Sequence, residues 1–157
     1  MNETQVFDQW KMWRGWTLEF LEEIPEERWD IIPEQLTNNI RWNAGHILVG
    51  WDHTVCTHFK LERMLPLQYH LLFPRGSSPS EWKDEPPNAS KLMEQLEQQP
   101  GKLIEISKGK LDTPLEEPFL HMTTLGEMFL FHISHEAMHL SALNKINQST
   151  KNASPLK

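Results

Sequence analysis

Apolar residues recur at three- and four-residue spacings in four stretches of this chain, and no stretch shows the apolar-polar alternation of a half-buried strand. Such spacing gathers the apolar side chains on one face of an α-helix. The expected helices span about residues 4–24, 39–61, 88–107 and 124–147. Four amphipathic helices without strands predict an all-α domain. The simplest arrangement is a four-helix bundle, in which inward-facing side chains of facing helices build any site.

Short sequence signals mark the ends of these helices. Pro25 is expected to end the first helix, because proline cannot continue the backbone hydrogen bonds of a helix interior. Thr37 or Asn38 can serve as the N-cap of the second helix. Thr124 and Glu127 have the spacing of a capping box, in which each side chain bonds a backbone N–H near the other residue, so the last helix is expected to begin there.

Proline also shapes the middle of the chain. Segment 64–89 contains Pro66, Pro74, Pro79, Pro86 and Pro87, so most of it is expected to lack regular structure. A connection of this length within a compact domain is usually functional or disordered, and its apolar residues favour packing as a lid or rim. The pair at 100–101, proline then glycine, is expected to interrupt the third helix, because an interior proline removes one hydrogen bond.

Length and charge restrict the class of protein. A chain of 157 residues fits one domain, which we place at residues 1–150, followed by a disordered polar tail at 151–157. The net charge is -7 and no basic run or basic helix face is present, which argues against nucleic acid or an anionic membrane as a partner.

Cysteine usage and apolar runs point to the cytoplasm. Cys56 is the single cysteine, so no intramolecular disulfide can form, and a small buried hydrophobe is its expected role. The first residues lack the charged and apolar regions of a signal peptide. No apolar run approaches the roughly 18 residues that span a bilayer, and the seven tryptophans, Trp10, Trp13 and Trp16 among them, are interpreted as core.

The last predicted helix contains His135-Glu136-Ala137-Met138-His139, an H-E-x-x-H pattern. Its two imidazoles lie one turn apart on one helix face, so both can reach one metal ion. A catalytic metal usually takes three protein ligands and keeps one open position. No histidine or acidic residue follows His139, so a third ligand must come from upstream. The alternative is a pair of partly buried histidines that are hydrogen-bonded to their neighbours.

His46 is the preferred third ligand, because it lies among apolar residues of the second helix and is flanked by Gly45 and Gly50. Small residues let helices approach closely and leave space for an ion. A hydrogen-bonded core histidine is the alternative reading. His53 lies two turns beyond His46, about 10 Å along the helix, which is too far to share its ion. His132 shares the face of His135 and ranks second as a ligand or pocket residue.

The remaining histidines, His58, His70 and His121, lie at expected helix ends or in loops, where surface histidines are common. The tryptophans of the first helix are given no catalytic role. Glycine-rich phosphate-binding loops and a G-x-S-x-G elbow are missing from the sequence, which argues against the common nucleotide-binding and serine-hydrolase classes.

Three segments together resemble a known family. They are NIRWNAGH at 39–46, SPSEW at 78–82 ahead of a proline pair, and HEAMH at 135–139. The chain resembles the DinB/YfiT-like superfamily of metal-binding four-helix bundles over about residues 4–147. The resemblance implies that His46, His135 and His139 bind a divalent metal ion, commonly zinc or nickel, and that the protein is a homodimer. Characterised relatives include transferases and isomerases that use low-molecular-weight thiols such as bacillithiol, mycothiol or glutathione.

The sequence departs from the family pattern at two places. Many relatives continue with His-x-Gly-Gln after the second histidine of the last helix, whereas this chain continues with Leu140, Ser141 and Ala142. The contacts of that glutamine are therefore not expected here. The third helix, which the family usually keeps continuous, contains the proline-glycine pair described above.

These residues lead to one leading hypothesis and one alternative. The leading hypothesis is a metal-dependent transferase that uses a low-molecular-weight thiol, or a hydrolase, acting on a small molecule. Glu136 is the candidate base or a residue behind the ligands, and an exposed helix glutamate is the equal alternative. The alternative function is a non-catalytic bundle whose metal or histidine cluster is structural and which acts through dimerisation or ligand binding. A peptidase of the H-E-x-x-H class is disfavoured.

Overall fold

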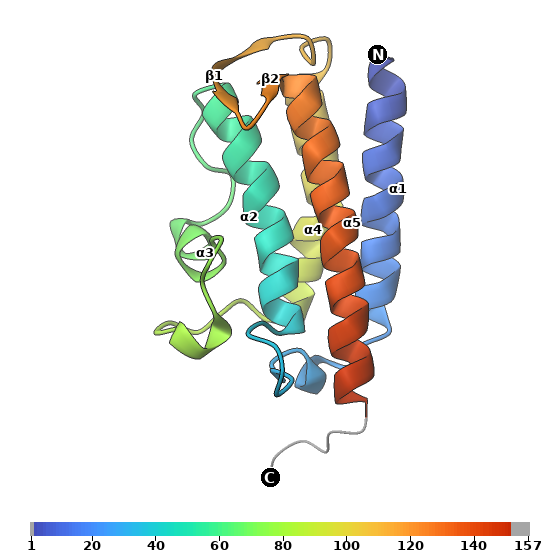
Figure 1. Cartoon of the computed structure of the whole chain (residues 1–157), viewed down its shortest axis with the longest axis vertical. Helices are drawn as coiled ribbons and strands as arrows, with labels where there is room; N and C mark the ends of the chain where they lie inside the picture. The colour runs from blue at the N-terminus through green and yellow to red at the C-terminus, as the bar shows by residue number, and fades with distance from the viewer. Residues whose placement is uncertain (1, 152–157) are drawn as a thin grey trace.

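The computed structural model describes residues 2–151 and is mainly helical. Figure 1 shows the long helices side by side, joined at their ends by shorter elements. In chain order the elements are α1 (Glu3–Glu22), η1 (Glu26–Arg28), α2 (Ile40–His58), α3 (Leu67–Leu72), η2 (Pro79–Glu81), α4 (Ala89–Ser107), β1 (Pro114–Phe119), β2 (Met122–Thr124) and α5 (Leu125–Thr150). The all-α prediction is confirmed.

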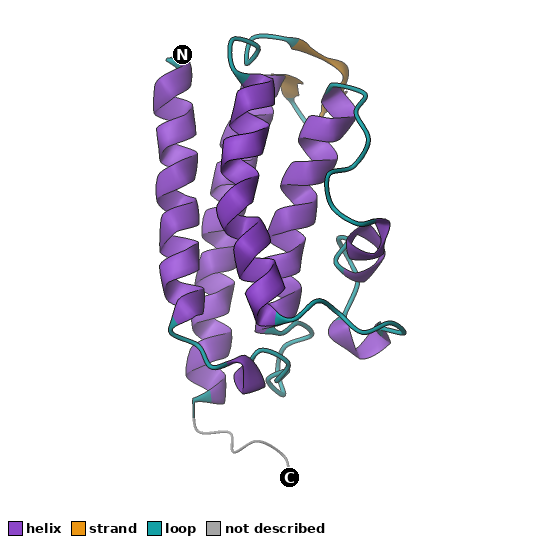
Figure 2. Cartoon of the chain, turned by 180° about the vertical axis from the view of Figure 1, so that it is seen from behind, coloured by secondary structure: helices purple, strands orange, loops and turns teal. Residues whose placement is uncertain are grey.

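The long helices form a bundle in which α1 and α2 each pack against both α4 and α5. The colours of Figure 1 show that α1 and α5 run downward, whereas α2 and α4 run upward. The connection between α2 and α4 must therefore return along the whole length of the bundle, which is why it is long. Figure 2 shows this connection from behind, beside α2. One long crossover of this kind is common among four-helix bundles.

The helices begin at side-chain caps. Asn2, Asn39 and Asn88 each accept a backbone N–H of the first turn of α1, α2 and α4. The cap of α2 is therefore Asn39, so the expectation of Thr37 or Asn38 is wrong by one or two residues. Thr124 and Glu127 form the complete capping box that the sequence predicts, and α5 begins there. Caps of this kind contribute roughly 1 kcal/mol each.

Helix α4 is continuous through Pro100, so the predicted interruption is wrong. The proline cannot donate to the carbonyl of Leu96, four residues earlier. Arg14 on α1 replaces the missing donor, since its Nη1 donates to the Leu96 carbonyl oxygen at 2.8 Å. The backbone group that proline leaves without a partner is thus satisfied from a neighbouring helix.

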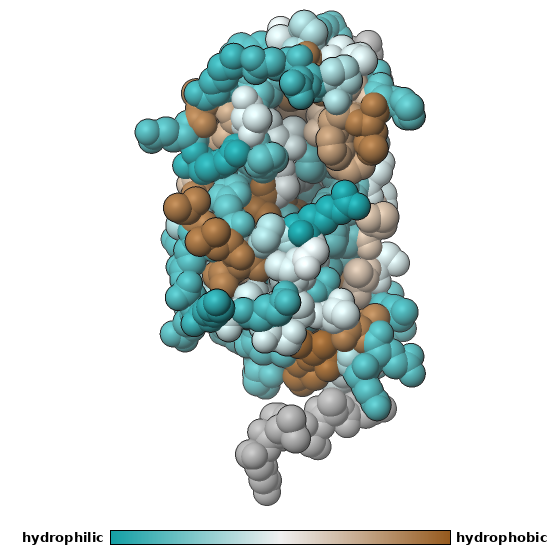
Figure 3. Space-filling view, turned by 60° about the vertical axis from the view of Figure 1, so that its left-hand side comes forward, coloured by the Kyte–Doolittle hydropathy of each residue, from teal (hydrophilic) through white to brown (hydrophobic). Residues whose placement is uncertain are grey.

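The connection between α2 and α4 is mostly irregular, as predicted, but includes the short helices α3 and η2. Its inner side is anchored by Phe73, which is fully buried, and by Trp82, which packs edge-on against it. Figure 3 turns this side forward and shows separate hydrophobic patches on a mostly hydrophilic surface. The exposed large hydrophobic residues of this part of the chain are Leu61, Met64, Leu67 and Leu71.

A two-stranded antiparallel hairpin, β1 with β2, connects α4 to α5 at one end of the bundle, where the sequence predicted only irregular chain. Most of its side chains are exposed or half-buried, so the strands carry no apolar alternation that a sequence pattern could reveal. Leu125 and Gly126 at the start of α5 donate backbone hydrogen bonds to Thr113 and Leu111, and these bonds attach the hairpin to the bundle.

The end of α5 extends to Thr150, three residues beyond the predicted end. Arg28 stabilises this last turn, because its Nη2 donates to the Asn147 carbonyl and to the Thr150 hydroxyl. Of the predicted polar tail at 151–157, residues 152–157 lie outside the described residues. The prediction of core tryptophans holds for Trp10, which is fully buried, but is wrong for Trp16, whose side chain is 45% exposed.

Candidate metal centre

The structure brings His46 of α2 together with His135 and His139 of α5. One ring nitrogen from each of the three lies within 4.8 Å of the other two. His135 and His139 face each other directly, with their Nε2 atoms 3.1 Å apart. The two histidines of the H-E-x-x-H pattern therefore lie one turn apart, as predicted, and face the upstream histidine across the α2–α5 interface.

His46 is oriented by the connection that follows α2. Its Nδ1 donates to the Phe73 carbonyl oxygen at 2.7 Å, and its ring stacks on Trp42 with centroids 4.5 Å apart. The backbone at Gly45 allows this approach, since a Cβ atom there would lie 2.5 Å from the Phe73 ring. With Nδ1 occupied as a donor, the lone pair of the neutral ring lies on Nε2.

His139 is oriented by Asn43, a residue that the sequence did not single out. Its Nδ1 donates to the Asn43 side-chain oxygen at 2.7 Å. The Asn43 amide cannot point the other way, because its Nδ2 donates to the Asn39 carbonyl oxygen, also at 2.7 Å. Only its position could have indicated this role, because Asn43 lies three residues before His46 on nearly the same face of α2. A hydrogen bond of this kind fixes the tautomer of a metal-binding histidine.

Burial keeps all three imidazoles neutral at pH 7. It lowers the pKa of His46, and it lowers the pKa of His135 to about 4 and that of His139 to about 3, with nearby histidines adding to the effect on the last two. Neutral imidazole is the form that binds a metal ion. Three neutral nitrogen donors suit a borderline ion such as zinc or nickel, so the donor set fits the metal that the resemblance implies.

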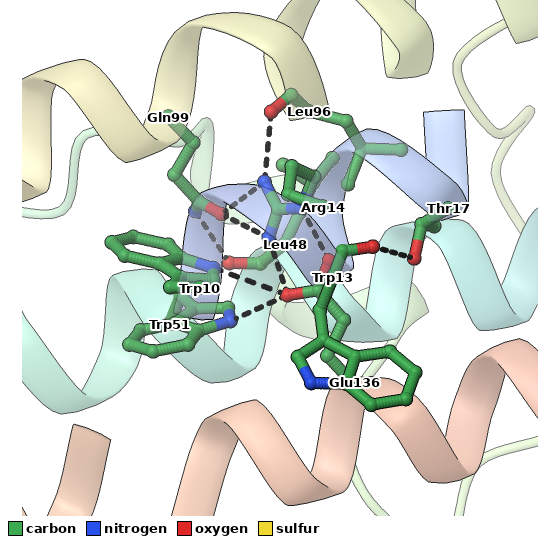
Figure 4. Close-up of polar contacts among 9 residues, drawn as sticks. All are labelled: Trp10, Trp13, Arg14, Thr17, Leu48, Trp51, Leu96, Gln99 and Glu136. Atoms are coloured by element: carbon green, nitrogen blue, oxygen red, sulfur yellow. Dashed lines mark hydrogen bonds and ion pairs between the residues drawn. The ribbon is translucent and has the colours of Figure 1, made fainter. Parts of the chain in front are cut away.

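Glu136 is buried, and its side chain lies among donors from other helices. Figure 4 shows its carboxylate among the side chains of α1 and α2. Oε1 accepts from Arg14 Nε at 2.5 Å, and Oε2 accepts from Arg14 Nη2 and from the indole N–H groups of Trp10 and Trp51. The alternative of an exposed helix glutamate is wrong, since Glu136 is 1% exposed.

The hydrogen-bond network around Glu136 joins the four long helices. Arg14 also donates to the side-chain oxygen of Gln99 on α4, and Gln99 Nε2 donates in turn to the Leu48 carbonyl on α2. Glu136 directly follows His135 on α5. The network that holds Glu136 therefore also fixes the rotation of α5 at the histidine cluster. No role could be predicted for Arg14, because an arginine inside an amphipathic pattern carries no signal of its partner.

His132, which lies three residues before His135 on α5, is buried but lies outside the cluster. Its Nε2 lies 2.6 Å from the Thr54 hydroxyl, and its Nδ1 has no hydrogen-bond partner among the described residues. His53 is also outside, as predicted, and its Nδ1 accepts from Arg63. Neither His132 nor His53 belongs to the group of ring nitrogens that could hold one ion.

The surface interpretation holds for His121, which is exposed, and His58 is half-buried. It is wrong for His70, whose side chain is 15% exposed and whose Nε2 donates to the buried carboxylate of Asp52 at 2.8 Å. Cys56 is fully buried, as predicted, and burial raises the pKa of its thiol. Its Sγ donates to the other Asp52 oxygen, so this carboxylate organises the chain that leaves α2.

Comparison with known proteins agrees with this architecture. The DinB superfamily matches residues 9–143. A search of the curated proteins found no match. A solved structure described as the conserved protein of locus from Enterococcus faecalis has the same fold, with a TM-score of 0.63 and 11% sequence identity over 95% of this chain and 96% of that one.

None of the helices within residues 2–151 combines the length and the apolar character that crossing a bilayer requires.

Proposed function

The chain belongs to the DinB superfamily, and from this premise we propose that it binds one divalent metal ion through His46, His135 and His139. We further propose that it is a metal-dependent transferase that uses a low-molecular-weight thiol, or a hydrolase, and that it acts on a small molecule. Zinc and nickel are the proposed ions.

The observation that carries the proposal is the pair of hydrogen bonds behind the ligands. His46 Nδ1 is committed to the Phe73 carbonyl and His139 Nδ1 to the Asn43 amide. Both residues thereby keep the other nitrogen for an ion, in a fixed ring orientation. Two histidines that merely hydrogen-bond to each other do not need a second hydrogen bond behind each ring. Metal-binding histidines almost always have one.

The proposed chemistry follows from the neutrality of the three imidazole ligands. A divalent ion held by three neutral imidazoles retains its charge and, when bound, lowers the pKa of a water or thiol at its open position. The chain itself contributes two aromatic walls beside the cluster. Trp42 stacks on His46, and the ring of Phe131 lies nearly parallel to that of His135, with centroids 5.9 Å apart. These walls suit the apolar part of a small substrate.

The contacts of Glu136 favour a positioning role over that of the base. All four donors to its carboxylate come from Arg14, Trp10 and Trp51, so both carboxylate oxygens are directed toward α1 and α2 and are occupied by structural hydrogen bonds. Loss of activity in Glu136→Gln at unchanged stability and metal content would instead assign the carboxylate as the general base. The homodimer and the cytoplasmic location stay predictions from the sequence, and light scattering of the purified protein measures the first.

Metal analysis of untagged protein tests the site. After dialysis against zinc or nickel, the wild type is expected to hold one ion per chain. The triple alanine variant of His46, His135 and His139 should hold almost none. A matched control replaces three of the five histidines outside the cluster, His53, His58 and His121, and should keep the ion. Equal, substoichiometric metal in all three proteins would overturn the proposal.

A thermal-shift series tests the thiol. The metal-loaded protein is heated with bacillithiol, mycothiol or glutathione, since a ligand that binds the native state stabilises it by mass action. We expect a further increase in Tm for one thiol, which the triple alanine variant should not show. A shift with metal and none with any thiol would remove the thiol transferase and leave the hydrolase.

One observation favours a second candidate function. The 3.1 Å separation of the His135 and His139 Nε2 atoms is the length of a direct hydrogen bond, which a non-catalytic bundle with a histidine cluster would also contain. Such a protein would act through dimerisation or ligand binding. A crystal structure with zinc discriminates the two, because a fourth protein ligand marks a structural site and an open position marks a catalytic one.

A further inference from the structure

A cleft of about 330 Å³ lies at the end of the bundle where α2 and α4 begin. It is bounded by the chain between α1 and α2 and the start of α2, and by η2 with the residues that follow it. Its polar lining includes Glu26, Asp30, Asn39, Arg41 and Glu85. None of the three clustered histidines lines it, so the cleft is separate from the candidate metal centre. Its volume lies in the range of sites for small ligands.

The charges of the cleft leave an excess of carboxylates. Arg41 is buried, and its positive charge is matched by Asp30, whose two oxygens accept from Nε and Nη2 at 2.6 and 2.7 Å. A third donor of Arg41, Nη1, bonds the Glu26 side chain and the Pro87 carbonyl. The carboxylate of Glu85 remains exposed to the cleft, and no described cation pairs with it. The lining therefore carries a net negative charge.

The opposite wall of the cleft is apolar and rigid. It consists of the indole of Trp82, which is half-buried, and the rings of Pro79 and Pro86. The indole is held in place, because its N–H donates to the Leu72 carbonyl at 2.9 Å. A fixed indole beside carboxylates is a suitable environment for an organic cation, which is attracted by both the ring face and the negative charge.

A buried amide supplies an independent indication of a ligand. Asn39 lines the cleft although only 1% of it is exposed. Its side-chain oxygen caps α2 by accepting from the Trp42 N–H. Its Nδ2 has no hydrogen-bond partner within residues 2–151 and is not fully buried, so it can donate to water or to a ligand acceptor in the cleft. A ligand with an oxygen acceptor satisfies it.

We propose that this cleft binds a small organic ammonium ion that also carries a hydrogen-bond acceptor. The ammonium group lies near Glu85 and Glu26, the apolar body lies against Trp82, and the acceptor oxygen receives the Asn39 amide proton. The site needs neither the histidine cluster nor its metal. Loss of the metal site and loss of this cleft are therefore distinguishable in experiment.

Three related probes test the proposal on the full-length chain. Tyramine has the ammonium group, the ring and an oxygen; 4-ethylphenol lacks the ammonium group, and phenethylamine lacks the oxygen. Each is titrated into ¹⁵N-labelled protein, and the shifts of the Asn39 side-chain amide and the Trp82 indole N–H are followed. The titration is repeated with the metal-free and the zinc-loaded protein, which should bind alike.

Tyramine is expected to saturate both signals, with 4-ethylphenol at least about tenfold weaker and phenethylamine weaker than tyramine. Glu85→Gln should weaken tyramine binding by about threefold, as expected for an exposed charge pair. Its matched control, Glu97→Gln on the outside of α4, should leave binding unchanged. Saturation by 4-ethylphenol at the same concentration, equal binding by the two glutamine variants, or no saturable shift up to 20 mM tyramine would each overturn the proposal.

Discussion

Asn43 accepts the Nδ1 proton of His139 across the interface between α2 and α5, at 2.7 Å. The bond ties a proposed metal ligand to the helix that carries another ligand, His46. Asn43 itself is held by the Asn39 carbonyl, so the start of α2 determines the ring orientation at the centre of the cluster.

Replacing Asn43 should therefore weaken metal binding more than folding. For Asn43→Ala we expect a loss of about 10- to 100-fold in zinc affinity, as is typical when the partner behind a ligating histidine is removed. Competition with a chromogenic chelator measures the affinity. Asn144→Ala, on the exposed side of α5, serves as the control. Identical affinities for the two variants would show that the bond does not orient the ligand.

Gly45 should resist enlargement. The new Cβ of Gly45→Ala would lie 2.5 Å from the Phe73 ring, so Phe73 must shift, and we expect this shift to disturb the bond from His46 Nδ1 to the Phe73 carbonyl. We expect a loss of about 1–3 kcal/mol in the free energy of unfolding, together with weaker zinc binding. Gly15→Ala on α1 has no atom within 4 Å of its Cβ and should be neutral or slightly stabilising. Urea denaturation of the metal-free proteins compares them.

The buried pair of Arg14 and Glu136 should be essential for stability. Glu136→Gln leaves the buried guanidinium without its counter-charge, for which we expect a loss of about 3–5 kcal/mol. The double variant Arg14→Met, Glu136→Leu removes both charges and should recover much of that loss. If Glu136→Gln instead folds with wild-type stability and metal content but loses activity, the carboxylate is the base and not a positioning residue.

Lowering the pH should destabilise the metal-free protein. The pKa of His132 and of His139 is lowered to about 3, and that of His135 to about 4, chiefly by burial, whereas an unfolded histidine titrates near 6.5. Between pH 6.5 and 4 the unfolded chain therefore binds protons that the native chain does not. The stabilisation is fully present above pH 6.5 and decreases as the pH falls toward the native values.

The size of this effect is at most about 1.4 kcal/mol per pH unit for each histidine. Urea denaturation in the presence of a chelator at pH 7, 6 and 5 measures the slope. His132→Gln removes one titrating group that is not a proposed metal ligand, and its slope should be smaller by about one proton. A stability that stays constant over this range would contradict the assignment of neutral buried histidines.

Much of the fold was accessible from the sequence because helix periodicity and capping are local properties. The capping box at Thr124 and the histidine spacing in α5 needed no knowledge of distant residues. The continuity of α4 was not accessible, because the donor that compensates for Pro100 is Arg14, more than eighty residues away. The hairpin was missed for a different reason: its exposed strands carry no pattern that burial imposes.

The candidate site divides in the same way. His46, His135 and His139 could be proposed because their residue type and helical position are visible in the sequence. Asn43 could not be distinguished from other polar residues at a helix start. The environment of Glu136 was hidden as well, because burial against α1 and α2 depends on how α5 is rotated in the bundle, and the sequence leaves that rotation undetermined.

The bond from Arg14 to the Leu96 carbonyl has a consequence for the order in which the chain folds. An isolated α4 has a gap in its hydrogen bonds at Pro100, and Arg14 of α1 closes this gap. Helix α4 should therefore be a weak helix until α1 docks, and the amides of the two helices should become protected from hydrogen exchange in the same event. The N-terminal helix, synthesised first, thus completes a helix that emerges some seventy residues later.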